Sequence, residues 1–182
     1  VKIDEVSLKF PSSKLWESWT TLRSHALRFD LEEYYLNQET KVNLKPEIIW
    51  EIEKGTTLNN DSIEKALSYR RDWIEFLYSF FEKYDFFLLP SAQVFPFSAE
   101  TPYPTDIGGK KMDTYHRWME VVIPASLAGL PTISIPCGYN SDGLPMGIQL
   151  IGGFKNDLKV LATAHLFEKI SHDSLNTKAL PN

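Results

Sequence analysis

Glycine and proline are distributed very unevenly along this chain of 182 residues, and their distribution limits how it can fold. Eight of the nine glycines lie at or after Gly108, and eight of the eleven prolines lie between Pro90 and Pro145. Both residue types interrupt regular helices, so the second half is expected to consist of strands and turns and the first half of helices. We interpret the two halves as two layers of one domain. No segment repeats at a fixed period, which excludes solenoids and propellers.

Composition excludes several classes of function. The chain has 24 acidic and 19 basic side chains, a net charge of −5, and binding to nucleic acid or anionic lipid needs clustered Lys and Arg. No apolar run approaches about 20 residues, the length that crosses a bilayer, and Val1 to Phe10 lack the apolar stretch of a signal peptide. The single cysteine, Cys137, cannot form an intramolecular disulfide. We therefore expect a soluble cytoplasmic protein with no nucleic-acid partner, no membrane partner and no metal.

The first half carries three helix patterns and one strand pattern. Alternating apolar residues at positions 6–10 predict a short strand that ends at a proline. Ser12 or Ser13 is a suitable cap for the helix that follows, whose apolar residues recur at three- and four-residue spacing. A short helix is predicted over residues 46–55, with a glycine in a left-handed conformation at its end. Residues 61–64 resemble a capping box that begins a helix reaching about residue 84.

The second half reads as strands separated by turns. Residues 85–90 form a continuous apolar run that ends in proline, a pattern typical of a strand buried on both faces of a parallel or mixed sheet. A long loop, residues 91–111, follows this strand, and loops of that length are usually functional. Residues 132–136 and 146–151 are predicted strands, and the turn residues at 140–143 favour an antiparallel hairpin between them.

Two further helices complete the predicted order of elements. The first covers residues 112–127 and is kinked or divided at Pro124. The second begins at Asn156 or Asp157 and has apolar residues at helical spacing, with the expected buried side formed by Leu158, Leu161, Ala164, Phe167 and Ile170. Helices and strands in this order predict an α/β fold.

Three blocks of the second half carry a family resemblance. They are Asp85-Phe-Phe-Leu-Leu-Pro90, Ser126-Leu-Ala-Gly-Leu-Pro131-Thr-Ile-Ser-Ile-Pro136-Cys-Gly138 and Gly143-Leu-Pro-Met-Gly-Ile-Gln149-Leu-Ile-Gly152. In this order they strongly resemble the C-terminal part of the amidase signature family, and the similarity runs from about residue 45 to residue 170. The resemblance implies a mixed β-sheet flanked by helices, and hydrolysis of an amide C–N bond or transfer of its acyl group, with no cofactor.

The residues that perform this reaction in the family have no counterpart here. The family's nucleophile is a serine activated through a second serine and a lysine, next to a loop rich in glycine and serine that stabilises the oxyanion. The only adjacent serines, Ser12 and Ser13, lie between Pro11 and Lys14, far from any glycine, and are better explained as a helix cap. We therefore assign no catalytic residue in this chain.

Residues 1–182 are accordingly expected to be the C-terminal portion of an amidase domain whose catalytic N-terminal portion lies outside this chain. Alone, the chain is expected to be inactive. Its partners would be a small-molecule amide in the complete enzyme and either the missing portion or a second copy, bound through exposed apolar surface. The alternative is a non-catalytic binding or structural module that docks on a partner chain.

Aromatic and apolar residues on or beside the long loop are candidates for substrate binding, because in the family this region borders the acyl or amine site. The candidates are Phe95, Tyr103, Ile107, Tyr115 and Trp118, with Phe97 beside them. The alternative role for the same residues is ordinary core packing under a long loop.

Cys137 offers a rival reading as a cysteine nucleophile, with His116 or His165 as its base. Cysteine is also among the residues most often buried for structural reasons, and Cys137 lies between a proline and a glycine at the end of a predicted strand. We favour the structural role.

Overall fold

The structure is a computed structural model that describes residues 2–176, with side chains described as far as residue 171. The chain divides into two compact units, Val1–Phe76 and Leu77–Asn182, and the boundary falls within one long helix, α4 (Asn60–Phe81). None of the helices in the described residues is long and apolar enough to span a membrane.

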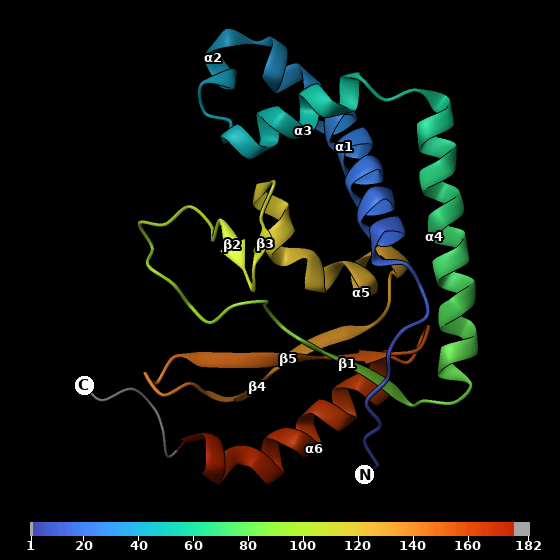
Figure 1. Ribbon diagram of the computed structural model, residues 1–182, viewed down its shortest axis with the longest axis vertical. Helices are drawn as coiled ribbons and strands as arrows, with labels where there is room; N and C mark the ends of the chain where they lie inside the picture. The colour runs from blue at the N-terminus through green and yellow to red at the C-terminus, as the bar shows by residue number, and fades with distance from the viewer. Residues whose placement is uncertain (1, 177–182) are drawn as a thin grey trace. The chain divides into compact units, whose positions relative to one another are not determined.

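The first unit is helical, as predicted. It contains α1 (Ser12–Leu36), the single turn α2 (Gln38–Lys41), α3 (Pro46–Thr56) and the first part of α4. α1 lies against α3, and Figure 1 shows the two helices crossing in the blue and cyan part of the chain. Gly55 lies inside α3, so the predicted end of the helix at this glycine is wrong. A Cβ atom at Gly55 would lie 2.5 Å from the carbonyl oxygen of Ser24 in α1, so this glycine permits close contact between helices.

The buried side of α1 is largely polar. Ser18, Thr21 and Ser24 are buried beside Leu15, whereas Ala26, which the apolar spacing placed on the buried face, is exposed. The hydroxyl of Ser18 donates a hydrogen bond to the carbonyl oxygen of Ala66 in α4, at 2.7 Å. Small side chains that form their own hydrogen bonds therefore allow α1 to pack closely without an apolar stripe.

The predicted caps of α1 and α4 are wrong by one or two residues. Pro11 precedes α1 and provides no side-chain cap, so neither serine of the adjacent pair caps the helix. At α4 the cap is Asn59, whose Oδ1 accepts from the amide of Ser62 at 2.9 Å. The hydroxyl of Ser62 in turn accepts from the amide of Asn59 at 3.2 Å. This is the reciprocal pattern of a capping box, two residues earlier than predicted.

No strand forms at residues 6–10, which is a further correction. Phe10 instead places its ring 5.0 Å from that of Trp73 and 5.8 Å from that of Phe76, between ring centroids. Burying an aromatic ring against α4 satisfies this segment without a neighbouring strand, which an isolated extended segment would need for its backbone hydrogen bonds.

The second unit is built on a three-stranded sheet in the order β1-β5-β4. Its strands are β1 (Phe86–Pro90), β4 (Thr132–Tyr139) and β5 (Pro145–Gly152), and both strand pairs are antiparallel. The predicted hairpin between β4 and β5 is confirmed. Its turn is closed by Asn140, whose Oδ1 accepts from the amides of Asp142 and Leu144 at 3.0 and 2.8 Å.

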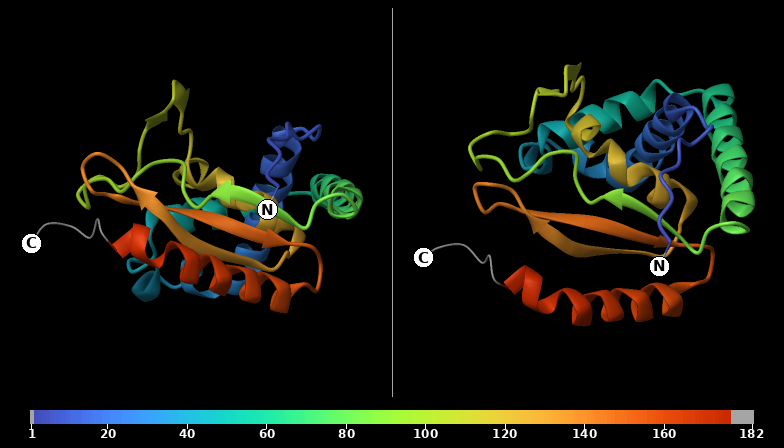
Figure 2. Two further views of the ribbon diagram at one scale, coloured as in Figure 1. Left: turned by 90° about the horizontal axis from the view of Figure 1, so that it is seen from below. Right: turned by 60° about the horizontal axis from the view of Figure 1, so that its bottom comes forward.

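Helices lie on both faces of this sheet (Figure 1). α6 (Asp157–Asn176) runs along one face, and the 3₁₀ helix η1 (Tyr115–Val122) with α5 (Ile123–Ala128) lies on the other, which the turned views of Figure 2 confirm. The core under α6 is aliphatic and consists of Ile135, Leu150, Val160 and Ala164, with Phe167 packed against it. Three residues expected on this buried side are exposed instead, namely Leu158, Leu161 and Ile170.

The predicted α/β class is confirmed by these layers of helix and antiparallel sheet. β1 pairs only with β5 among the described strands, and Leu88 is 42% exposed, so β1 is an edge strand here rather than one buried on both faces. The mixed pairing expected for the sheet is not formed by the strands described, which pair only in antiparallel fashion. The division at Pro124 is confirmed, since η1 ends and α5 begins beside this proline.

Candidate functional site

Four aromatic side chains gather between the long loop and η1, and we call them the aromatic cluster: Phe97, Tyr103, Tyr115 and Trp118. The ring of Phe97 meets that of Trp118 edge to face at 5.5 Å, and Tyr103 meets Tyr115 in the same way at 5.7 Å. Tyr115 and Trp118 are 6.3 Å apart between centroids. Edge-to-face pairs at such distances are favourable aromatic contacts. Three of the four residues, Tyr103, Tyr115 and Trp118, are candidates from the sequence.

The remaining two candidates are placed differently. Phe95 is 38% exposed and makes no ring contact with the described residues. Ile107 belongs to a small antiparallel hairpin of β2 (Asp106–Ile107) and β3 (Lys110–Lys111), where it pairs with Lys110. This hairpin interrupts the long loop that the sequence predicts.

The 3₁₀ geometry of η1 aligns part of the aromatic cluster. A 3₁₀ helix has three residues per turn, so side chains at positions i and i+3 lie above one another. Tyr115 and Trp118 are three residues apart, and Val121 continues the same row. The sequence predicted an α-helix in this segment, whose 3.6-residue period would have turned these rings away from one another.

Two buried polar atoms near the aromatic cluster have no hydrogen-bond partner among the described residues. They are the indole Nε1 of Trp118 and the hydroxyl Oγ1 of Thr114, the residue before η1. Leaving a buried donor unpaired costs about 1–3 kcal/mol. Such groups are unusual in a packed interior, so this end of η1 differs from ordinary core.

Side chains from the sheet and the loop fasten the last turn of η1. The side-chain oxygen of Gln93 accepts from the amide of Val121 at 3.0 Å. The side-chain nitrogen of Gln149, in β5, donates to the carbonyl oxygen of Val121 at 3.2 Å and to that of Pro90, at the end of β1, at 2.8 Å. Gln149 is 5% exposed. Neither glutamine is among the candidates from the sequence, because no local pattern marks a glutamine that bonds to a segment 28 residues away.

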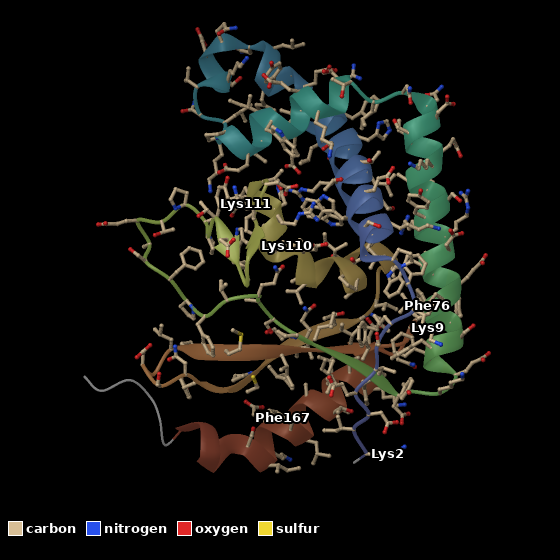
Figure 3. All side chains as sticks on the ribbon, in the orientation of Figure 1. Lys2, Lys9, Phe76, Lys110, Lys111 and Phe167 are labelled. Atoms are coloured by element: carbon tan, nitrogen blue, oxygen red, sulfur yellow. The ribbon has the colours of Figure 1, made fainter. Side chains whose placement is uncertain are left out.

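A charged network joins η1 to the hairpin. Lys110, labelled in Figure 3, pairs with Glu120 at 2.8 Å, and Glu120 also meets Arg117 at 3.3 Å. Arg117 forms two hydrogen bonds with Asp113, at 3.0 and 3.2 Å, and this interaction lowers the pKa of the Asp113 carboxyl. Burial acts to lower the pKa of Arg117, but the bond to Asp113 and the charge of Glu120 outweigh it, so this pKa is raised. The predicted solvated edge at Lys110 is therefore held in place by an ion pair.

Two serine hydroxyls meet where β1 ends. Ser91 Oγ lies 2.6 Å from Ser134 Oγ of β4, and no lysine lies within hydrogen-bonding distance of either among the described residues. A Cβ atom at Gly147 of β5 would lie 2.9 Å from Ser91 Oγ, so the glycine leaves room for this contact. The pair has no described base to activate it, and its geometry is that of a structural hydrogen bond.

The structure does not bring a base to Cys137. Cys137 is exposed, at a register shift in β4, and makes no hydrogen bond or ion pair with the described residues. His116 is buried in η1, and His165 is on α6 with its Nδ1 3.7 Å from a carboxylate oxygen of Glu168. The thiol is therefore neither the buried structural residue that we favoured nor part of a described cysteine–histidine pair.

Comparison with known proteins places the chain in one family. Residues 5–161 match the family named Amidase. Curated relatives include the GatA-type chain of glutamyl-tRNA(Gln) amidotransferase from Alkaliphilus metalliredigens (strain QYMF), 33% identical over 108 residues, which are 58% of this chain and 20% of that protein. The corresponding protein from Prochlorococcus marinus (strain MIT 9312) is 56% identical over 48 residues, or 26% of this chain and 10% of that protein.

A solved structure supports the same fold. The crystal structure of a bacterial aryl acylamidase of the amidase signature family superposes with a TM-score of 0.76 and 21% identity. The match covers 93% of this chain and 36% of that protein, so the chain spans about a third of the length of that structure and a fifth or less of the curated relatives. At this identity the likeness concerns the fold.

Proposed function

Because the chain belongs to the amidase family, we propose that it is the C-terminal portion of a hydrolase that cleaves carboxamide C–N bonds. The family match over residues 5–161 carries this proposal. The parent enzyme acts on a small, linear amide in the cytoplasm. It uses the family's Ser-Ser-Lys relay, whose residues lie outside these 182 residues, and needs no organic cofactor or metal.

The proposal predicts that the isolated chain is inactive. The one close pair of serine hydroxyls described, Ser91 with Ser134, has no lysine beside it, and Ser12 and Ser13 lie in the first turn of α1. A serine hydroxyl without a base is a weak nucleophile near neutral pH.

The test compares the isolated chain with the protein expressed from the full reading frame of its gene, on a panel of primary carboxamides and anilides such as 4-nitroacetanilide. We expect hydrolysis by the full-length protein only. Serine-dependent turnover by the isolated chain, lost in a Ser91→Ala or Ser134→Ala variant, would contradict inactivity of the fragment. No turnover by the full-length protein on any substrate of the panel would contradict the amidase function itself.

We also propose that the aromatic cluster forms one wall of the amide-binding site, with Phe95 and Ile107 at its border. Support comes from its two unpaired buried polar groups, Trp118 Nε1 and Thr114 Oγ1. An amide offers both an acceptor and a donor to such groups, and its apolar substituent gains from contact with the rings. Phe97, 40% exposed and in edge-to-face contact with Trp118, lies at the open side of the cluster.

Binding of 4-fluorobenzamide, followed through its fluorine resonance, tests this wall in the isolated chain. We expect a weak, saturable interaction that Trp118→Ala reduces at least about fivefold, since a lost aromatic contact is worth about 1 kcal/mol. Trp50→Ala is the control, because Trp50 is a half-exposed tryptophan in α3 of the other unit. Equal loss in both variants, or none in either, would contradict the role of the cluster.

A partner surface is proposed on α6. Leu158, Leu161, Leu166 and Ile170 are 55–82% exposed and lie away from the core residues Val160 and Ala164. Exposed apolar rows of this kind favour association, here with the rest of the parent domain or with a second copy of the chain. The same surface supports the second candidate function, a non-catalytic module that docks on a partner. Light scattering of the isolated chain should show self-association that Leu158→Lys with Ile170→Lys reduces; a monomer at high concentration would contradict it.

A further inference from the structure

Both backbone polar groups of Val121 are bonded to glutamine side chains. Its amide donates to Gln93 at 3.0 Å, and its carbonyl accepts from Gln149 at 3.2 Å. The same nitrogen of Gln149 donates to Pro90 at 2.8 Å, so one buried side chain joins the end of β1, the middle of the sheet and the last turn of η1. We call Gln93 and Gln149 the amide clamp.

The amide clamp acts at the base of the aromatic row. Val121 lies one 3₁₀ turn after Trp118, and Trp118 lies one turn after Tyr115. A fixed Val121 peptide therefore sets the rotation of η1 about its axis, and with it the direction of both rings. The contact of Trp118 with Phe97 is made from the loop in which Gln93 also lies, so the clamp and the ring pair connect the same two segments at two points.

We infer that Gln93 and Gln149 are positioning residues that hold Trp118 and Tyr115 in the orientation that binds the amide substrate, an inference that rests on the proposed substrate wall. Neither glutamine needs to touch the substrate. Each fixes the backbone from which an aromatic side chain projects, and the preference of the site among amides depends on that fixed geometry.

The two glutamines act with opposite chemistry, which makes the inference testable. Gln149 acts as a donor to two carbonyl oxygens, whereas Gln93 acts as an acceptor from an N–H. A glutamate accepts hydrogen bonds but cannot donate them when ionised. Gln93→Glu should therefore keep the bond to Val121, and Gln149→Glu should lose both of its bonds and place a negative charge against two carbonyl oxygens.

The experiment uses the chain labelled with 5-fluorotryptophan, in which Trp118→Phe identifies the Trp118 resonance among the five tryptophans. At about pH 8, where glutamate is ionised, Gln149→Glu should shift or broaden this resonance and weaken 4-fluorobenzamide binding about fivefold or more. Gln93→Glu should leave the resonance in place and the affinity within about twofold, which is the scale of small surface effects. Gln38→Glu changes the same charge on the exposed turn α2 and is the control.

A second variant keeps the test decisive if Gln149→Glu does not fold. Gln93→Met has a similar length but accepts no hydrogen bond from Val121, so it should shift the Trp118 resonance while Gln93→Glu does not. Rescue by the acceptor, at constant position, separates hydrogen-bonded positioning from general packing. The inference is overturned if Gln93→Glu and Gln93→Met behave alike, or if no variant moves the Trp118 resonance.

The outcomes also separate this inference from the proposed function. If the unsubstituted chain does not bind 4-fluorobenzamide but its Trp118 resonance follows the expected pattern, the clamp stands and the substrate wall fails. If the probe binds in a Trp118-dependent way while Gln149→Glu and Gln93→Met bind it normally, the wall stands and the clamp has no positioning role.

Discussion

The two units of this chain bury different kinds of side chain. In Val1–Phe76 the most deeply buried residues include Ser18, Ser24 and Glu51, each no more than 1% exposed. In Leu77–Asn182 the core under α6 is aliphatic, formed around Leu150 and Val160. The first unit is held by close approach of helices and by polar contacts, and the second by apolar area.

This difference explains where burial can be read from a pattern of apolar residues. An aliphatic core leaves a periodic trace in the sequence, because each buried position is occupied by an apolar residue. A helix contact made by glycine and serine leaves no such trace, since these residues are equally common on surfaces and in turns. Ser18 and Gly55 are therefore as important to packing as Leu150, although only the leucine is marked by its type.

The largest expected effect is on the aliphatic core. Leu150→Ala removes a side chain that is 5% exposed and should lower the free energy of unfolding by about 3 kcal/mol, through lost apolar burial and the cavity left behind. Urea unfolding measures this change. Leu158→Ala, at 82% exposure on the adjoining helix, should stay within about 0.5 kcal/mol. Similar effects of the two substitutions would contradict the assignment of the core to this side of α6.

The corresponding test of the helical unit is Gly55→Ala. In an open helix this change stabilises by about 1 kcal/mol, but here the new Cβ would lie 2.5 Å from Ser24 O and 2.8 Å from Arg28 Cβ. We expect a loss of about 2 kcal/mol instead, as α1 and α3 are forced apart. Gly108→Ala is the control, because its φ of +60° strains any side chain while nothing lies within 4 Å, and it should cost about 1 kcal/mol. Stabilisation by Gly55→Ala would show that the helices are not in close contact.

Much of the fold of the second unit follows from its sequence. The hairpin of β4 and β5 is marked by alternation and by turn residues, and its turn is closed by Asn140 as such sequences predict. The strand expected at residues 6–10 fails for a reason that local sequence does not contain. Whether Phe10 pairs in a sheet or packs on Trp73 depends on a segment about 60 residues away in the chain.

The candidate site is predictable in its composition but not in its geometry. The aromatic residues are visible as a group, and three of them do meet. Their alignment depends on η1 being a 3₁₀ helix, and that depends on hydrogen bonds from Gln93 and Gln149, which lie 28 residues before and after Val121. Long-range polar contacts of this kind have no periodicity, so sequence patterns identify the rings and miss the residues that hold them.

A smaller effect is expected from the buried ion pair of the helical unit. The Arg23 guanidinium lies 2.6 Å from a carboxylate oxygen of Glu51, whose side chain is 2% exposed. Arg23→Met leaves that carboxylate without this partner and should cost about 1–2 kcal/mol, less than for a fully buried pair because Arg23 is 39% exposed. A double-mutant cycle with Glu51→Gln measures the coupling by urea unfolding. Additive losses would show that the pair does not stabilise this unit.

The smallest expected effect is the pH dependence contributed by Asp113. The hydrogen bond from Arg117 lowers the pKa of this carboxyl in the folded state, so the unfolded chain binds its proton more readily. The stabilisation is therefore complete above the unfolded pKa of about 3.9 and is lost as the pH falls through the lower, folded pKa. Because the Asp113 side chain is 58% exposed, its size should be about 0.5 kcal/mol or less.

The measurement for this ion pair is the difference in unfolding free energy between the unsubstituted chain and Asp113→Asn, followed from about pH 7 to about pH 3, a range that spans the carboxyl titration. The difference should shrink toward acid. Asp142→Asn is the control, since Asp142 is exposed and makes no side-chain ion pair with the described residues. A constant difference across the range would mean that Arg117 stabilises η1 through packing and Glu120 alone. The ionic contacts of the second unit would then be independent of the Asp113 charge, whereas those of the first unit depend on the charge of Glu51.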